Sequence, residues 1–530
     1  MNAEPISADT FVSFPAAIAA HAAANPGGLA FRVDGHEFDW QTLHVQISQV
    51  AAAMVDSGVG AGDRVAMFGA ASLSYIACFF GAVAARACVV PLPLSASADA
   101  LERMVADSGA KLLFFDPESG SAMAPLMQEL ATRLSLRVQL LSSDTETLAA
   151  CAHRQAAGNV MPRLAPGSPE DPFNIIYSSG TTGVPKGIVH LHGMRQRQAS
   201  RKGFAFSPSS LSLLSTPIYS NTTIMPMLGA VANGGACVLM RKFDAGLFLE
   251  TTQALRVTHT MLVPVQYRRI LSHPLFDSEK LGTLALSQST GAPMDVALKR
   301  EILDRWPGRF LEIYGLTEGG VSCFLEPSAH PDKLHTVGRP GHGTEVFLLD
   351  DMGSRLPGGD DAQAGEVVGR SPFMMAGYHH RPEADAEIRW ADQDGHIYHR
   401  TGDIGRFDAD GFLTLLDRKK DVIISGGNNL YAADLEAVLM QHPDVVEAAV
   451  IGVPSAAWGE TPLGLVVGCP GTTLDATALC AWANERLGKT QRLSAVELRS
   501  ALPRNALGKL SKKELRASYW LAEAAAAERP

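Results

Sequence analysis

Hydrophobic positions in the first 335 residues form short runs that alternate with longer, helix-like stretches. RVAMFGA at 64–70 and ACVVPLPL at 87–94 have the composition of buried strands, and LSYIACFFGAVAA at 73–85 between them has that of a helix. The alternation continues through apolar runs at 212–219, 236–240, 259–265 and 283–289. Strands separated by helices predict a layered α/β core in which helices cover a mostly parallel sheet.

The pattern changes near residue 337 to short strands and turns. EVFLLDDMG at 345–353, GEVVGR at 365–370 and GFLTLLDR at 411–418 predict a small β-barrel-like subdomain over about 337–419. From 420 a compact α+β pattern continues to about residue 517, and LAEAAAAERP at 521–530 is expected to be a fraying tail. The fold class is therefore α/β, with a large N-terminal domain over 1–419 and a small C-terminal domain over 420–530.

Composition narrows the class of protein. The chain has 530 residues, 46% hydrophobic and 19% charged, which is typical of a soluble globular protein with more than one domain. A net charge of -10 argues against a nucleic-acid partner. Seven cysteines show no CxxC pair and indicate buried thiols in a reducing compartment.

Targeting signals are also missing from the pattern. The longest apolar run ends at Arg86, well short of the roughly twenty apolar residues that a membrane span needs. The start, MNAEPISADTF, has no basic region of the kind that begins a signal peptide. We expect a cytoplasmic protein without a membrane span.

One stretch concentrates small polar residues after an apolar strand: YSSGTTGVPKGIVH at 177–190, following FNII at 173–176. Glycine-rich backbone can turn several N–H groups toward a phosphate, hydroxyl groups add donors, and Lys186 adds a positive charge. A surface turn rich in small residues is the plain alternative. A Walker loop is excluded, because Pro185 and Gly187 flank Lys186 where that motif has glycine and a magnesium-binding hydroxyl.

The stretch resembles the phosphate loop of the adenylate-forming superfamily, which comprises acyl-CoA synthetases, adenylation domains of peptide synthetases, and luciferases. Other motifs of that family follow in the family order as far as Lys509. The resemblance implies that ATP phosphates are bound by Lys186 together with these loop residues: Ser178, Ser179, Gly180, Thr181, Thr182 and Gly183.

Two further motifs complete the expected nucleotide site. In YGLTEGG at 314–320, the resemblance gives Tyr314 and Gly315 to adenine, Thr317 to the α-phosphate and Glu318 to Mg²⁺. Carboxylate oxygen suits this hard cation. The plain alternative is a tyrosine-capped turn with an exposed glutamate. STGAP at 289–293 resembles the segment lining the adenine pocket, through Gly291, Ala292 and Pro293.

A hairpin can be derived within 402–418. Asp410 and Gly411 form a strong two-residue turn signal, which places Asp403 opposite Arg418 on one face. A longer loop would shift the partner by a residue or two and leave the side chains neighbours. The resemblance gives both residues to the ribose; a plain cross-strand ion pair is the alternative.

The C-terminal motifs concern the second half of the reaction. LPRNALGKL at 502–510 resembles the catalytic-lysine motif, so Lys509 would contact the carboxylate and the α-phosphate; an ordinary exposed lysine is the alternative. Lys420 matches the hinge about which the family's small domain rotates. For CoA, the resemblance and the sequence suggest these residues: Gly426, Gly427, Trp458, Lys489 and Arg492. A tight turn is the alternative at the two glycines.

The acid-binding segment departs from the family pattern. In TPIYSNTTIMP at 216–226 the usual histidine is replaced by Ser220, beside Tyr219, Asn221 and Thr222. Arg201 falls near a position that faces the acid. Either these residues form a polar wall with one cation, which suits an acid with a second polar group, or Arg201 points outward and the pocket is an apolar slot for an aryl or medium acyl acid.

The resemblance implies an ATP-dependent acid–thiol ligase. It would activate a small carboxylic acid, aryl or short to medium acyl, as acyl-AMP and transfer it to CoA, with ATP, Mg²⁺ and CoA as cofactors. Competing readings are an enzyme that loads a separate carrier protein, a luciferase-like oxidase, and a non-catalytic nucleotide-binding relative. The oligomeric state, including a homodimer, is left open.

Overall fold

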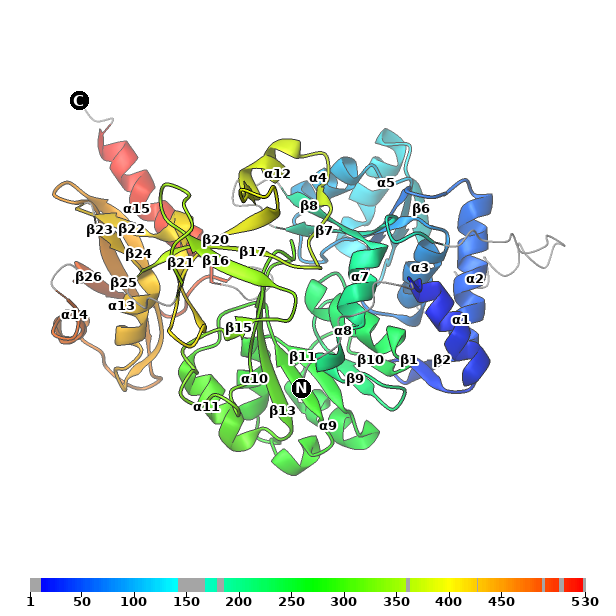
Figure 1. Ribbon diagram of the computed structural model, residues 1–530, viewed down its shortest axis with the longest axis horizontal. Helices are drawn as coiled ribbons and strands as arrows, with labels where there is room; N and C mark the ends of the chain where they lie inside the picture. The colour runs from blue at the N-terminus through cyan, green and yellow to red at the C-terminus, as the bar shows by residue number, and fades with distance from the viewer. Residues whose placement is uncertain are drawn as a thin grey trace. The chain divides into compact units, whose positions relative to one another are not determined.

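The computed structural model describes residues 11–141, 167–178, 185–358, 363–426, 428–488, 491–504 and 510–527. The chain divides into two compact units. The first comprises Met1–Glu345 and Arg370–His399, and the second comprises Val346–Gly369 and Arg400–Pro530. Figure 1 shows the elements of each. No helix among the described residues is long and apolar enough to cross a membrane.

A nine-stranded sheet forms one half of the first unit, in the order β15-β14-β13-β12-β11-β9-β10-β1-β2. Its central strands from β13 to β1 run parallel, and β2, β14 and β15 are antiparallel additions at the edges. The strands are β1 (Leu29–Val33), β2 (His36–Asp39), β9 (Leu211–Leu214), β10 (Ala236–Leu239), β11 (His259–Leu262), β12 (Leu286–Ser289), β13 (Arg309–Gly315), β14 (Ser322–Leu325) and β15 (Arg339–Pro340).

A seven-stranded sheet forms the other half, in the order β18-β8-β7-β4-β3-β5-β6. The strands from β7 to β6 are parallel, whereas β8 and β18 are antiparallel. The strands are β3 (Arg64–Phe68), β4 (Cys88–Pro91), β5 (Leu112–Phe115), β6 (Arg137–Leu140), β7 (Pro172–Ser178), β8 (Lys186–Leu191) and β18 (Gly377–Tyr378). The strands and helix predicted at 64–94 are confirmed.

Alternation along β3 shows how the layers form, because successive side chains on a strand point to opposite faces. Val65 and Met67 join a core with the nine-stranded sheet and four helices, whereas Ala66 and Phe68 join a core with two other helices. The shared helices are α1 (Phe14–Ala24), α2 (Trp40–Asp56), α3 (Leu73–Ala84) and α8 (Asn221–Ala232), and the outer ones are α4 (Ala98–Ser108) and α5 (Ala124–Arg133). One helical layer therefore lies between the two sheets.

The far face of the nine-stranded sheet carries its own helices, visible beside β11 and β13 in Figure 1. They are α9 (Ala245–Leu255), α10 (Pro264–Leu271) and α11 (Val296–Arg305), which share a core with Leu213 and Leu262. The central helix α3 differs from these, because its residues from Ser74 to Val83 are all buried. A helix that is apolar all round requires cover on every side.

A five-stranded sheet has the order β16-β17-β20-β19, and β21 also pairs with β20. The strands that lie wholly or largely in the second unit are β16 (Glu345–Leu349), β17 (Gly365–Arg370), β20 (Ile397–Phe407) and β21 (Leu413–Arg418). The fifth strand, β19 (Arg389–Ala391), and the start of β20, with which it pairs, belong to the first unit. Further along the chain, a second five-stranded sheet contains β22 (Ile423–Ser425), β23 (Asn428–Leu430), β24 (Val445–Ser455), β25 (Gly459–Gly468) and β26 (Ala495–Leu498). The predicted small β-rich and α+β regions correspond to these two sheets.

Three helices accompany the last sheet: α13 (Ala432–Leu439), α14 (Ala476–Asn484) and α15 (Lys512–Ala527). Leu435 and Leu439 of α13 pack with Val450 and Val466 in its core. The expected fraying tail is wrong for residues up to Ala527, because α15 continues through LAEAAAA. Alanine and glutamate are strong helix formers, so this stretch extends the helix.

Candidate active site

The two strands that flank the predicted phosphate loop form an antiparallel pair. Ser178, at the end of β7, is the register partner of Lys186, at the start of β8, and the Ser178 hydroxyl donates to the Lys186 carbonyl over 3.5 Å. The strand-to-loop position expected for the motif is therefore present at both ends. The loop residues Ser179, Gly180, Thr181, Thr182 and Gly183 lie outside the described residues.

The Lys186 side chain lies beside Tyr378. Its Nζ is 5.2 Å from the centroid of the Tyr378 ring and 3.7 Å from a carboxylate oxygen of Glu387. Tyr378 reaches this position because β18 pairs with β8, with Tyr378 opposite Ile188. An ammonium over a ring face is stabilised by the ring quadrupole, yet Lys186 is still one-quarter exposed. It is therefore held in place while remaining accessible.

Glu318 contacts the same tyrosine. The Tyr378 hydroxyl donates to Glu318 Oε1 over 2.9 Å, and burial followed by the Glu318 charge raises the pKa of that hydroxyl. Gly319 then requires glycine: its φ is 77°, and a Cβ would lie 1.7 Å from the Phe373 carbonyl oxygen. Sequence reasoning missed Tyr378, because no local pattern indicated that β18 would join β8.

Thr317 is held through its backbone. Its carbonyl accepts a hydrogen bond of 2.7 Å from Nε2 of His190. Because Nε2 donates, Nδ1 of His190 is the acceptor in the neutral ring. Burial, reinforced by the charge of Arg195, keeps the pKa of His190 well below its usual value. This fully buried histidine therefore fixes the motif loop from behind.

The adenine candidates lie at one edge of the nine-stranded sheet. Tyr314 and Gly315 end β13, and Gly291 follows β12, the adjacent parallel strand. Adjacent parallel strands have their carboxyl ends at the same edge, where α/β folds bind ligands. Gly291 has φ 90°, and a Cβ there would lie 3.5 Å from Val263 Cγ1 and 3.9 Å from Thr222 Oγ1. Ala292 and Pro293 continue the same segment.

The acid-pocket candidates gather at the start of α8. Ser220 is the N-cap: its hydroxyl accepts from the Thr222 N–H over 3.3 Å and donates to Thr222 Oγ1 over 3.1 Å. Asn221 Oδ1 accepts from Arg195 over 2.7 Å. The Tyr219 hydroxyl is 3.3 Å from Ser95 Oγ. The Thr222 hydroxyl thus lies near Gly291, which places this segment beside the adenine candidates.

Arg201 packs against aromatic rings. Its guanidinium carbon is 3.6 Å from the centroid of Phe373 and 5.5 Å from that of Phe324, and Nη2 donates to Ser322 Oγ over 3.5 Å. Burial lowers its pKa to about 10. The guanidinium therefore packs against these rings, and both interpretations of the acid pocket, the polar wall and the apolar slot, stay predictions.

In the second unit, Asp403 and Arg418 are register partners, and Arg418 Nε lies 2.7 Å from Asp403 Oδ1. The predicted pairing is confirmed, but the two-residue loop is wrong. Phe407 pairs with Leu413, and the Asp408 carboxylate accepts the N–H groups of Asp410 and Phe412, so the turn is one residue longer. An irregularity between Ile404 and Gly405 restores the register.

The remaining C-terminal candidates are only partly described. Lys420 is exposed within a short 3-10 helix, Lys419–Asp421. The Gly426 N–H donates to the Trp458 carbonyl over 2.9 Å, and Trp458 is 61% exposed. Arg492 is exposed. Gly427, Lys489 and Lys509 lie outside the described residues.

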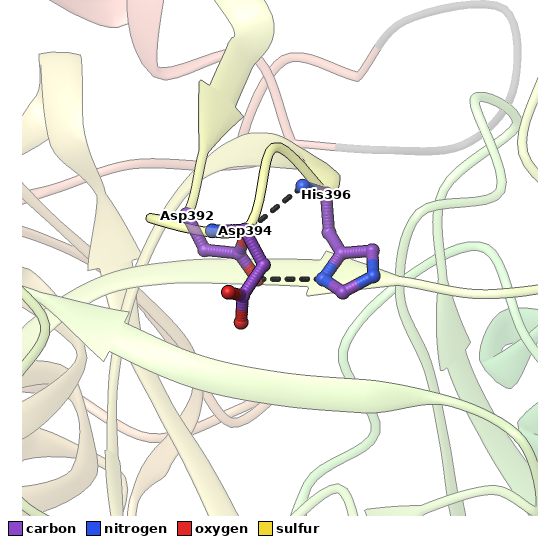
Figure 2. A group of neighbouring side chains, drawn as sticks. All are labelled: Asp392, Asp394 and His396. Atoms are coloured by element: carbon purple, nitrogen blue, oxygen red, sulfur yellow. Dashed lines mark hydrogen bonds and ion pairs between the residues drawn. The ribbon is translucent and has the colours of Figure 1, made fainter.

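A cluster of potential metal ligands among the described residues does not include the predicted magnesium residue, Glu318. Figure 2 shows Asp392, Asp394 and His396 in the turn between β19 and β20. Asp392 Oδ1 accepts the N–H groups of Asp394 (3.0 Å) and His396 (2.8 Å), and its Oδ2 lies 3.0 Å from His396 Nδ1. These contacts close the hairpin turn, and we assign no metal to them.

Comparison with known proteins agrees with the motifs. The AMP-binding enzyme model matches residues 18–379, and the AMP-binding enzyme C-terminal domain model matches residues 434–509. A feruloyl-CoA synthase from Amycolatopsis is 33% identical over 93% of this chain and 96% of its own length. The fatty acid–[acyl-carrier-protein] ligase ScoC from Streptomyces coeruleorubidus is 30% identical over 94% of this chain and 95% of its own.

Among solved structures, ATP-bound MatB from Rhodopseudomonas palustris aligns with a TM-score of 0.85 and 27% identity, over 96% of this chain and 99% of that one. The family models cover most of the chain, in the order in which the motifs occur. The protein belongs to the AMP-binding enzyme family and is, within the adenylate-forming superfamily, an AMP-forming enzyme of the acyl-CoA and aryl-CoA ligase group.

Proposed function

We propose that the protein is an ATP-dependent ligase that activates an aryl or short to medium acyl carboxylic acid as acyl-AMP and transfers the acyl group to CoA. Pyrophosphate leaves in the first step and AMP in the second. The observation that carries this proposal is the arrangement of Lys186 and Glu318 around Tyr378. Tyr378 contacts both Lys186, a cation suited to phosphate, and Glu318, a carboxylate suited to a metal ion. This pair of charges suits a nucleoside triphosphate with its metal.

Activation brings two anions together, so positioning and charge neutralisation dominate catalysis. Ser178 and Lys186 would bind ATP phosphates from the ends of β7 and β8, and Thr317 would contact the α-phosphate. Glu318 would hold Mg²⁺, which would supply positive charge to neutralise the phosphates. The residue fits this ion: within the described residues, its carboxylate has one hydrogen bond, at Oε1, which leaves Oε2 for a cation.

The C-terminal residues would serve both half-reactions. Asp403 is oriented by Arg418 and is only 7% exposed. Its carboxylate oxygens are suited to accept hydrogen bonds from ribose hydroxyls. Lys509 would stabilise charge in adenylation. We propose that the chain pivots at Lys420, between domains 1–419 and 420–530. Gly426 and Trp458 would then line the path of the CoA thiol, with Arg492 and Lys489 near its phosphates.

The relatives support the class of reaction and leave the acid open. Feruloyl-CoA synthase favours an aryl acid and CoA as acceptor. ScoC, which is named as a ligase for an acyl-carrier protein, supports a second candidate function, the loading of a separate carrier protein. The two candidates share the first half-reaction and differ in the thiol.

The decisive experiment measures AMP and pyrophosphate release with ATP, Mg²⁺ and a panel of aryl, fatty and dicarboxylic acids, and identifies products by mass spectrometry. We expect an acyl-CoA product that requires all components. AMP release that ignores CoA and needs a phosphopantetheinylated carrier protein would favour the second candidate. Absence of pyrophosphate release with every acid would contradict both.

A further inference from the structure

A buried arginine lies next to the acid-pocket candidates. Arg195, on α7 (His192–Ala199), has no exposed surface. Its Nε donates to Asn174 Oδ1 (2.9 Å), Nη1 to Gln198 Oε1 (2.8 Å) and Asn221 Oδ1 (2.7 Å), and Nη2 to His190 Nδ1 (3.1 Å). All four partners are uncharged. A buried charge without a counter-ion is costly, so its retention calls for an explanation.

Arg195 determines how Asn221 is oriented. A guanidinium carries donors only, so the Asn221 atom facing it must be the amide oxygen. The amide nitrogen, Nδ2, then points away from Arg195 with two N–H donors. Among the residues that the structure describes, Nδ2 of Asn221 has no hydrogen-bond partner, and the side chain is only partly buried. Arg195 thus fixes the orientation of Asn221, whose Nδ2 is left as an available hydrogen-bond donor.

The position of this donor connects it to the predicted substrates. Asn221 is the first residue of α8, between the N-cap Ser220 and Thr222, and Thr222 Oγ1 lies 3.9 Å from a Cβ built on Gly291. Through His190, the same arginine also supports the Thr317 carbonyl. One buried group therefore braces both a nucleotide motif and the acid segment.

The local field favours an electronegative atom at Asn221. The positive charge of Arg195 lies behind the amide, and the N-terminus of α8 adds its own partial positive charge. The side-chain oxygens of Ser220 and Asn221 are already engaged as acceptors. A ligand atom that meets Asn221 Nδ2 must therefore accept a hydrogen bond, and an apolar group there would leave the donor unpaired.

We propose that Asn221 is a specificity-determining residue that donates a hydrogen bond to an oxygen acceptor on the acid, separate from the reacting carboxylate, and that Arg195 is the residue that positions it. The preferred substrates are acids bearing a hydroxyl, alkoxy, carbonyl or second carboxylate oxygen, over the hydrocarbon acid of the same shape. This inference depends on the proposed ligase function.

The test compares kcat/KM for matched acids that differ only by the acceptor, such as cinnamate with 4-hydroxy- and 4-methoxycinnamate, and a medium-chain fatty acid with its oxo and dicarboxylic analogues. We expect the wild-type enzyme to favour one oxygenated member over its partner by about tenfold, the scale of one hydrogen bond. Equal values across every pair would overturn the inference and leave the ligase function intact. Failure to activate any acid would overturn both.

Substitutions at Asn221 test whether this residue causes the preference for oxygenated acids. Asn221→Asp keeps an oxygen for Arg195 and removes the donors, so it should reduce the preference about tenfold, through the KM for the acid and not for ATP. Asn221→Leu should do the same. A wild-type preference in both variants would contradict the assignment. Arg197, exposed on the same helix, donates to the Pro372 carbonyl, and Arg197→Gln serves as the control.

Arg195→Lys and Arg195→Met test the positioning role. Lysine supplies a charge without the planar set of donors, so it should restore only part of the preference that Met abolishes. A structural role alone would lower kcat/KM for both members of a pair equally, and that outcome would overturn the role of Arg195. If Arg195→Met fails to fold, as thermal unfolding would reveal, the Asn221 and Arg195→Lys variants carry the test.

Discussion

At the scale of single residues, short motifs suggest the nucleotide candidates but not the side chains that hold them in place. Gly291, Thr317 and Glu318 were proposed as nucleotide residues from motifs that resemble those of the family. Tyr378 and His190, which hold the last two in place, carry no such pattern. Their roles come from strand pairings and burial, which depend on residues far away in the sequence.

Removal of the Tyr378 hydroxyl tests whether this residue orients Glu318. Tyr378→Phe keeps the ring beside Lys186 and deletes the hydrogen bond to Glu318, so the carboxylate loses its fixed orientation. We expect adenylation, measured by pyrophosphate exchange, to fall about tenfold and to require more Mg²⁺. Tyr398→Phe, which deletes a hydroxyl that bonds Glu345, is the matched control. An unchanged Mg²⁺ dependence would argue against a metal at Glu318.

Protonation of His192 should make the fold sensitive to acid. Burial lowers its pKa to about 4, from a usual value of 6.5. Between these values the unfolded chain binds a proton that the folded chain refuses, so the free energy of unfolding should fall as pH drops from 6.5 to 4, by at most about 3 kcal/mol.

Urea unfolding at pH 6.5 and 4.5 measures the effect. His192→Gln should reduce the difference between the two pH values, whereas His36→Gln, at an exposed position, should not. An equal pH difference in all three proteins would show that His192 is not the responsible group.

At the scale of elements, the hairpin of β20 and β21 shows why pairing can be predicted while the turn is not. The Asp408 carboxylate captures two N–H groups and closes a longer turn, and the added residue is compensated by an irregularity further along. Asp403 still meets Arg418 because the two changes cancel. Turn length depends on such side-chain contacts, which the Asp-Gly signal alone does not include.

A substitution at the turn after β22 tests the predicted thiol path. A Cβ on Gly426, where φ is 56°, would lie 2.7 Å from Trp458 Cε3. Gly426→Ala should therefore displace the indole and slow thioester formation from supplied acyl-adenylate by about tenfold, while adenylation changes little. Gly471 also has a positive φ, 85°, but has open space around it, so Gly471→Ala controls for backbone strain without a clash. Equal effects of both variants would contradict a specific role for Trp458.

At the scale of the whole molecule, the alternation of strands and helices was enough to predict α/β layers. It did not predict how many sheets form, or that two sheets share one helical layer. Strand order places β10 beside β1 and β7 beside β4, and this order creates two sheets around one helical layer. Such long-range pairings leave no local periodicity. The continuation of α15 to Ala527 was missed for the opposite reason, because proximity to the chain end outweighed a clear local preference.

The proposed pivot at Lys420 predicts that the two half-reactions can be separated. Lys509→Ala should lower adenylation by about 10²–10³, the scale for one charge-stabilising group, and largely spare thioester formation from supplied acyl-adenylate. Rapid-quench assays of each half-reaction measure this, with Lys242→Ala at an exposed position as the control. Equal losses in both halves would contradict a scheme with two domain orientations.

The helix α3, apolar on every side, has a consequence for how the polypeptide emerges from the ribosome. Strands β3 and β4, which lie next to it in the sequence, are made early, but the opposite wall includes Cys237 and Leu239 of β10. In a nascent chain arrested before that point, the apolar surface of α3 would remain exposed to solvent. Truncations ending between 110 and 235 should therefore aggregate or depend on chaperones, whereas the full-length chain should not.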